Sequence, residues 1–364
     1  MRLRLLSSAG EIDVEGGRIA PRGGGPDLAL PFGDVEVRPG LVNAHDHLHR
    51  NHLPRLGSPP YASVYAWGDD LHARRAPELA RRDALPREWA LLFGALKNLL
   101  GGATAVVHHD PWEEAFDRHF PIRVPRLRAI HTLGLDGAAA RAAVGSRTPV
   151  SLHLAEGIDA ASAEEVREAD RIGLLGRNLL AVHLVGADAD GIARLQRSGA
   201  AVVWCPTSNL FLYGRTAPAA LLSSSADVLL GTDALVSGEG TLLHEIAAAR
   251  SLGLLTDEKL EAAVTHAAAR RLGLPPPSLV PGAPADVVVL RRPLLVARPQ
   301  DVALVLVGGN PVLADQAFGE LFEVSGVPAE GLAVGGVPKL VAAPLGAVAR
   351  EVFDLTPSCR RIVE

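Results

Sequence analysis

His45 and His47 stand two positions apart at the end of an apolar run that begins at Pro39. Residues two apart in a β-strand share a face, so both imidazoles would point to the same side of the strand. Two neutral imidazoles directed at one point suit a divalent transition metal such as zinc, and a catalytic site needs at most two further protein ligands and an open position. The pair therefore predicts part of a metal site.

Further candidate groups follow short apolar runs later in the chain. His153, His183 and Asp233 each end or directly follow such a run. Glu156 comes three residues after His153, where a loop can turn its carboxyl group back toward a bound substrate. A single His-x-His pair is a weak signal for a metal. Several such groups at the ends of strands together indicate one site.

These groups need a fold that brings strand ends together. From about residue 39 to 274, apolar runs alternate with Ala-, Leu- and Arg-rich helical stretches, which is the pattern of βα units around a parallel sheet. Eight strands of this kind predict an α/β fold, the closed (β/α)8 TIM barrel, whose reactive groups lie at the carboxyl ends of the strands. The candidate strands are Leu41–His45, Ala103–His108, Pro121–Val124, Leu127–His131, Val150–His153, Leu179–His183, Ala200–Trp204 and Val228–Gly231.

The two ends of the chain differ from this pattern. Residues 1–38 alternate short β-like pieces with Gly and Pro, which predicts hairpin strands. The triple proline at 275–277 ends the last helical stretch, and β-rich pieces follow it. We expect 1–38 and 275–364 to build one small β-sandwich beside a barrel of residues 39–274. The last thirty or so residues have no assigned place.

Composition excludes several classes of protein. With 48% hydrophobic and 21% charged residues, the 364-residue chain can bury a full core, and its formal net charge of −5 offers no basic surface for nucleic acid. Cys205 and Cys359 are the two cysteines, so a disulfide framework is excluded and a cytoplasmic location is expected. No secretory signal or run that could span a membrane is visible. A small-molecule substrate is the expected partner, and a homo-oligomer is left open.

Ordered motifs give the chain a family resemblance over roughly residues 1–315. They are the first-strand Pro-Gly-Leu-Val-Asn-Ala-His-Asp-His at 39–47, Gly-Gly-Ala-Thr at 101–104, His-Leu-Ala-Glu at 153–156, Ala-Val-His at 181–183, Cys-Pro-Thr-Ser-Asn at 205–209, Gly-Thr-Asp at 231–233, the closing helix at 262–274 and the return strand at 281–290. Together they resemble the amidohydrolase superfamily, in its cytosine-deaminase-like and guanine-deaminase-like branch of mononuclear metal hydrolases.

The resemblance implies a role for each candidate residue. One divalent metal would be held by His45, His47, His153 and Asp233, with zinc favoured over iron. Asp233 would also accept the proton of the metal-activated water, and Glu156 would act as general acid and proton shuttle. His183 would polarise the attacked group or orient the hydroxide. A two-metal site would need a bridging carboxylate or modified lysine, and no lysine lies between Lys97 and Lys259.

Substrate contacts are expected from four residues: His131, His109, Trp67 and Trp204. Trp67 could stack on a flat heterocycle or only pack its loop. Six further histidines are expected to be structural: His49, His52, His72, His119, His244 and His266. Asn209 is expected to hold its loop through hydrogen bonds from its side chain to the backbone. Asp286 is also expected to be structural.

Three departures from the family pattern bear on the substrate. The interval from Asp110 to His153 is short, which predicts the loss of a crossover helix near the third and fourth strands. Trp204 stands where relatives often have a polar residue, and His49 adds a third imidazole after the usual pair.

The function expected from this resemblance is a metal-dependent aminohydrolase, a deaminase that acts on a C–N bond of a small nitrogen heterocycle or amidine-like group. A cyclic amidase or a chlorohydrolase would use the same site for another leaving group. A noncatalytic scaffold of the same fold is a third alternative, which the presence of every candidate ligand disfavours.

Overall fold

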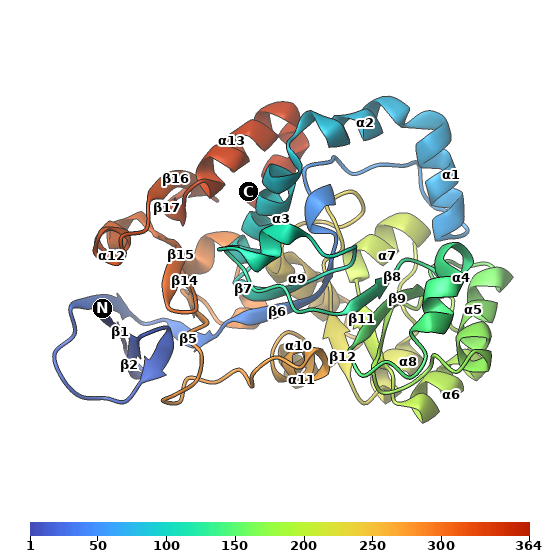
Figure 1. Cartoon of the computed structure of the whole chain (residues 1–364), viewed down its shortest axis with the longest axis horizontal. Helices are drawn as coiled ribbons and strands as arrows, with labels where there is room; N and C mark the ends of the chain where they lie inside the picture. The colour runs from blue at the N-terminus through green and yellow to red at the C-terminus, as the bar shows by residue number, and fades with distance from the viewer.

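A barrel of parallel strands forms the centre of the molecule (Figure 1). The computed structural model describes the backbone of residues 1–364 and every side chain except those of residues 81 and 82. Five parallel strands pair in the order β12-β11-β10-β9-β8, and β6 pairs with β7 in parallel. Their bounds are β6 Leu41–Asp46, β7 Ala103–His108, β8 Arg128–Ile130, β9 Val150–Leu154, β10 Leu179–His183, β11 Ala201–Trp204 and β12 Val228–Leu230.

Strand alternation divides the barrel residues between two cores. Val42, Val182 and Val203 belong to a cluster inside the barrel, while Leu41, Ala181 and Trp204 belong to the cluster between the strands and the helices. Residues of opposite parity on one strand face opposite sides, which is the period expected of β-structure. The helices of the barrel region are α1 Val64–Arg74, α2 Ala76–Ala80, α3 Arg87–Leu100, α4 Leu133–Ala142, α5 Ala160–Arg171, α6 Ala189–Ser198, α7 Pro206–Tyr213, α8 Ala219–Ser224, α9 Leu242–Leu252, α10 Asp257–Ala263 and α11 His266–Leu272.

The prediction of a strand at Pro121–Val124 is wrong. Only Arg123 makes a bridge there, parallel to Ala105 of β7, with Val106 N donating to Arg123 O at 2.9 Å. Pro121 and Pro125 flank this short segment and have no N–H to donate, which limits it to a single bridge. No α-helix lies between β7 and β8 in the described backbone, so the predicted loss of a crossover helix is confirmed.

Both chain ends contribute to a second β-structure with a shared core. A four-stranded sheet has the order β3-β2-β1-β4, and a six-stranded sheet has the order β16-β17-β15-β14-β13-β5. Leu3 and Val14 of the first sheet and Val287 and Leu304 of the second lie in one buried cluster. The strands are β1 Arg2–Ser7, β2 Gly10–Glu15, β3 Arg18–Ala20, β4 Leu28–Gly33, β5 Glu36–Pro39, β13 Val287–Leu290, β14 Val302–Val307, β15 Asn310–Asp315, β16 Ala329–Val334 and β17 Val337–Ala342. The domain boundaries themselves stay predictions.

The C-terminal residues return to the barrel. After helix α12 (Gly319–Ser325) and the β16–β17 hairpin, helix α13 (Leu345–Leu355) lies along α3 (Figure 1), with the Phe93 and Phe353 rings 5.9 Å apart. The short helix η7 (Pro357–Ile362) then reaches two barrel loops. Cys359 Sγ donates to Asn51 O at 3.5 Å, and Arg361 Nε donates to Glu239 O at 2.8 Å. Within the described residues, no helix is both long and apolar enough to cross a lipid bilayer.

Candidate metal centre

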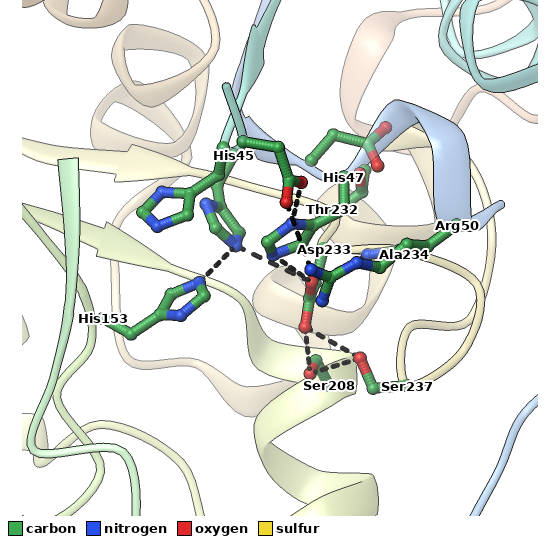
Figure 2. Close-up of polar contacts among 12 residues, drawn as sticks. His45, His47, Arg50, His153, Ser208, Thr232, Asp233, Ala234 and Ser237 are labelled. Carbon is green, nitrogen blue, oxygen red and sulfur yellow. Dashed lines mark hydrogen bonds and ion pairs between the residues drawn. The ribbon is translucent and has the colours of Figure 1, made fainter. Parts of the chain in front are cut away.

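Three strand ends bring four candidate ligands to one place. His45 comes from β6 and His47 directly follows that strand, His153 comes from β9, and Asp233 from the turn after β12. His45 Nε2 lies 3.2 Å from His153 Nε2 and 3.6 Å from Asp233 Oδ1, and His47 Nε2 lies 3.7 Å from the same Asp233 oxygen. Figure 2 shows the three imidazoles and the carboxylate pointing toward one another.

These separations fit a zinc-sized ion. Ligand atoms about 2.0–2.1 Å from zinc in a tetrahedral arrangement lie about 3.4 Å apart, which is close to the distances from His45 to His153 and from Asp233 to His45 and His47. Burial lowers the pKa of His47 to about 3, and burial also lowers the pKa of His45 and His153. The imidazoles are therefore neutral at pH 7 and offer lone pairs to a metal.

Neighbouring side chains orient two of the imidazoles. Asp110 Oδ2 lies 2.5 Å from His47 Nδ1, and His131 Nδ1 lies 2.9 Å from His153 Nδ1. A hydrogen bond at Nδ1 fixes the ring and leaves Nε2 free to ligate, as partners of metal-binding histidines commonly do. The sequence analysis did not identify Asp110 as a partner of a candidate ligand. The signal that could have pointed to it is its position directly after His108 and His109.

Asp233 is held as an ionised carboxylate. Ser208 Oγ and Ser237 Oγ donate to its Oδ2 at 2.8 and 2.7 Å, and Ala234 N donates to Oδ1 at 2.8 Å (Figure 2). Burial opposes the charge, but hydrogen bonding to His45 and the neighbouring histidines hold the pKa of Asp233 well below its ordinary value.

The backbone is strained at these strand ends. Ala155, His183, Leu184 and Asp233 are the described non-glycine residues with positive φ, at 50°, 73°, 54° and 52°. Each conformation of this type costs of the order of 1–3 kcal/mol and clusters at functional sites, where the surrounding structure enforces it. All of them lie beside or within the candidate residues.

Glu156 lies beside the ligands and holds a proton near neutrality. Its Oε1 accepts a hydrogen bond from Tyr213 Oη at 2.9 Å and lies 3.7 Å from His183 Nε2. Its Oε2 is buried without a hydrogen-bond partner in the described structure. Burial raises the pKa of Glu156 to about 7, so a large fraction of the carboxyl groups is protonated at neutral pH. Tyr213 is a further residue that sequence reasoning missed.

His183 is fixed by Asn209. Asn209 Oδ1 accepts a hydrogen bond from His183 Nδ1 at 2.8 Å, which leaves Nε2 directed toward Glu156 and the ligand group. Asn209 was expected to hold its own loop through side-chain to backbone bonds. Its side chain bonds to the end of β10 in two ways, since Oδ1 contacts the imidazole of His183 and Nδ2 donates to His183 O at 3.5 Å.

A cavity of about 400 Å³ opens next to His131. Its walls combine apolar side chains with an arginine, a carboxylate and imidazoles. The lining residues include Leu53, Trp67, Leu71, Leu79 and Val236 on the apolar side, and His49, Arg50, Asp69, His72 and His131 on the polar side. Arg50 is tied to Asp110, since one guanidinium nitrogen lies 3.1 Å from Asp110 Oδ1.

The four predicted substrate residues are placed differently. His131 and Trp67 line the cavity, and Trp67 also donates to Leu56 O at 3.0 Å. His109 is buried, with its ring nitrogens 2.9 Å from Ser151 Oγ and from Ile130 O, and its ring stacks on His153. Trp204 is fully buried on the helix side of β11 and donates to Thr216 Oγ1. Strand alternation therefore turns Trp204 away from the cavity.

Comparison with known proteins gives a family and relatives. The model of the amidohydrolase family matches residues 127–312, more than half of the chain. A 5-methylthioadenosine/S-adenosylhomocysteine deaminase of Symbiobacterium thermophilum is 27% identical over 410 residues, which cover 84% of this chain and 89% of that relative.

Solved structures confirm the fold. A zinc-bound adenosine deaminase from Xanthomonas campestris superposes with a TM-score of 0.71 at 18% identity, over 99% of this chain and 98% of that one. A zinc complex of atrazine chlorohydrolase from Arthrobacter aurescens superposes with a TM-score of 0.68 at 16% identity, over 97% and 98% of the two chains.

Proposed function

This chain belongs to the amidohydrolase family, and we propose that it is a metal-dependent deaminase that hydrolyses a C–N bond of a small nitrogen heterocycle. The observation that carries the proposal is the buried, proton-holding Glu156 next to the cluster of candidate ligands. A general acid with a pKa near the working pH is what protonation of a ring nitrogen requires.

The residues fit one divalent metal, held by His45, His47, His153 and Asp233. Such a metal would lower the pKa of a bound water toward 7 and so provide a nucleophile at neutral pH. Zinc suits three imidazoles and one carboxylate, and we propose zinc rather than iron on that donor set.

We assign the proton transfers to two carboxyl groups. Asp233, held as an ionised carboxylate, accepts the proton of the attacking water. Glu156 donates its proton to the ring nitrogen beside the attacked carbon, while His183 Nε2 orients the attacking oxygen. Collapse of the tetrahedral intermediate breaks the C–N bond: the amino group leaves as ammonia with the proton held by Asp233, the hydroxyl proton returns to Glu156, and a carbonyl remains.

We propose an adenosine derivative with an apolar substituent as the substrate. Deaminases of 5-methylthioadenosine and S-adenosylhomocysteine are among the relatives. The cavity beside His131 supports such a substrate because one of its sides is formed by Leu53, Leu71 and Val236. Its volume of about 400 Å³ offers room beyond a single heterocycle.

The test is a substrate panel with ammonia release as the readout. We expect 5-methylthioadenosine to release ammonia faster than adenosine, guanine or cytosine, and chelation to abolish the release until zinc is restored. Activity retained without metal would contradict the mechanism. A ring-opened product or halide release from a triazine, without ammonia, would favour the cyclic amidase or the chlorohydrolase. A chain that binds no metal would favour the scaffold. The cytoplasmic location and the oligomeric state stay predictions.

A further inference from the structure

A buried lysine lies directly beneath the candidate ligands. Lys97, on α3, is fully buried, and its Nζ lies 3.0 Å from Asp46 Oδ2, 2.7 Å from Asp233 O and 3.0 Å from Thr232 Oγ1. An ammonium group has three N–H donors, so these contacts satisfy all of them.

Asp46 is the residue between the two histidines of the first strand. Because side chains alternate along a strand, its carboxylate points away from the face that His45 and His47 share. It accepts hydrogen bonds from Asn98 Nδ2 at 2.7 Å and from Asn51 Nδ2 at 2.9 Å, in addition to the contact with Lys97. The ion pair is therefore enclosed by polar partners on the underside of the site.

The lysine connects two segments that each carry ligands. Through Asp46 it contacts β6, and through Thr232 and the Asp233 carbonyl it contacts the turn after β12. The same two segments meet through Thr232 N and Asp233 N, which donate to His45 O at 3.0 and 3.1 Å. Asp233 has a φ of 52°, a conformation that needs support from its surroundings.

A buried ion pair is a poor means of stabilising a fold, because desolvation offsets the attraction, and an apolar pair of similar volume is often as stable. We propose that the Lys97–Asp46 pair is a positioning device: it holds the β6 histidines and Asp233 at the separation that a metal requires, so that metal affinity depends on it. This inference rests on the proposed metal-dependent function.

The test uses a charge-balanced double variant, Asp46→Asn with Lys97→Met, which removes the ion pair without leaving one charge unpaired. Zinc affinity is measured by competition with a chelator, thermal unfolding is measured on the metal-free protein, and kcat and KM are measured with saturating zinc. We expect zinc affinity to fall about 10- to 100-fold. With saturating zinc, we expect kcat to decrease and KM to change less. The unfolding temperature of the metal-free variant should stay close to that of the metal-free wild type.

A second buried lysine provides the matched control. Lys339, in the six-stranded sheet, pairs with Asp315 and donates to Gln300 O and Val302 O. Asp315 also pairs with the partly exposed Arg291, which keeps access to solvent in the control. The double variant Asp315→Asn with Lys339→Met is expected to keep the wild-type zinc affinity. An equal loss in both double variants would overturn the positioning role, since it would show a general effect of removing a buried pair.

Other outcomes also decide the question. Wild-type zinc affinity in the Asp46→Asn, Lys97→Met variant would overturn the inference and leave the proposed function intact. A wild-type protein that binds no zinc would overturn both. If the double variant does not fold, the single variant Asp46→Asn decides, because it removes the carboxylate of the ion pair and keeps the size of the side chain. We expect zinc affinity several-fold weaker in that variant, and an unchanged affinity would overturn the inference.

Discussion

Glu156 combines two properties that a sequence motif alone does not provide. Its carboxyl group is buried, which raises its pKa to about 7, and one of its oxygens has no hydrogen-bond partner in the described structure. Tyr213 binds the other oxygen at 2.9 Å and so fixes the direction of the carboxyl group. A proton carrier with one free oxygen beside the ligand cluster is suited to deliver its proton to a bound ring.

The variant Glu156→Gln tests this role. The amide keeps the shape and the Tyr213 contact but cannot donate an acidic proton, so we expect kcat to fall about 10²- to 10⁴-fold with the zinc content unchanged. Turnover is measured by ammonia release and zinc by metal analysis of the same sample. Glu164→Gln, an exposed position on α5, is the control and should behave as the wild type. Unchanged turnover in Glu156→Gln would contradict the role.

At the scale of elements, α9 holds the first turn of α7, which carries Ser208 and Asn209. Glu245 of α9 is fully buried and accepts hydrogen bonds from Thr207 N, at 3.2 Å, and from Thr207 Oγ1. Burial raises the pKa of Glu245 to about 8. The helix therefore supports the turn through a carboxyl group that is protonated at neutral pH.

This pKa predicts a dependence of stability on pH. In the unfolded chain Glu245 ionises near its ordinary value of 4.5, while in the folded chain it keeps its proton up to about 8. The unfolded state therefore binds fewer protons between these values, and the contribution of Glu245 to stability, complete below pH 4.5, is lost as pH rises toward 8. The variant Glu245→Gln removes this loss. We expect its stability relative to the wild type to increase by up to about 1.4 kcal/mol per pH unit across that window, measured by urea unfolding. A constant difference would contradict the assignment.

The elements that the sequence predicted are those with local signals. Seven of the eight barrel strands predicted from apolar runs are present, and the motif at 205–209 lies at the start of α7, where Ser208 bonds to Asp233 and Asn209 bonds to His183. The segment at 121–124 has the same apolar character, but its flanking prolines prevent a ladder. Trp204, which was expected to contact substrate, lies on the helix side of β11, and a pattern of apolar residues does not show which face of a buried strand each residue takes.

Sequence patterns did not predict which side chains of distant elements contact one another. Lys97 lies 51 positions after Asp46, in a helix whose apolar pattern gives no sign of which side chain reaches the strands. The C-terminal tail was left unplaced for the same reason: its helix α13 is recognised only by what it covers, the outer face of α3.

For the molecule as a whole, α13 packs against α3, the helix that carries Lys97. Phe353 of α13 is buried against Phe93 of α3. Truncation of a buried phenylalanine to alanine costs about 3–5 kcal/mol, so Phe353→Ala should lower the free energy of unfolding by that amount. Leu355→Ala, at a position 38% exposed on the same helix, is the control and should change it little. Equal effects in the two variants, measured by denaturant unfolding, would show that α13 does not pack as described.

Metal removal should also act on the whole molecule, because the candidate ligands come from β6, β9 and the turn after β12. A metal that binds only the folded chain adds about 2.7 kcal/mol of stability when its free concentration is 100 times the dissociation constant. We expect chelation to lower the unfolding temperature and added zinc to restore it. Calorimetry measures both changes. The Asp233→Ala variant should show no such response. A response equal to that of the wild type would place the ion elsewhere.

The helix η7 joins the loops that follow the first and last strands of the barrel, through Cys359 at Asn51 and Arg361 at Glu239. During synthesis, the ribosome releases every candidate ligand long before it releases these residues. A nascent chain halted before residue 357 would thus carry the complete set of metal-binding groups with the two rim loops still unjoined. We therefore expect a chain halted before residue 357 to release ammonia more slowly than a chain that includes residues 357–364.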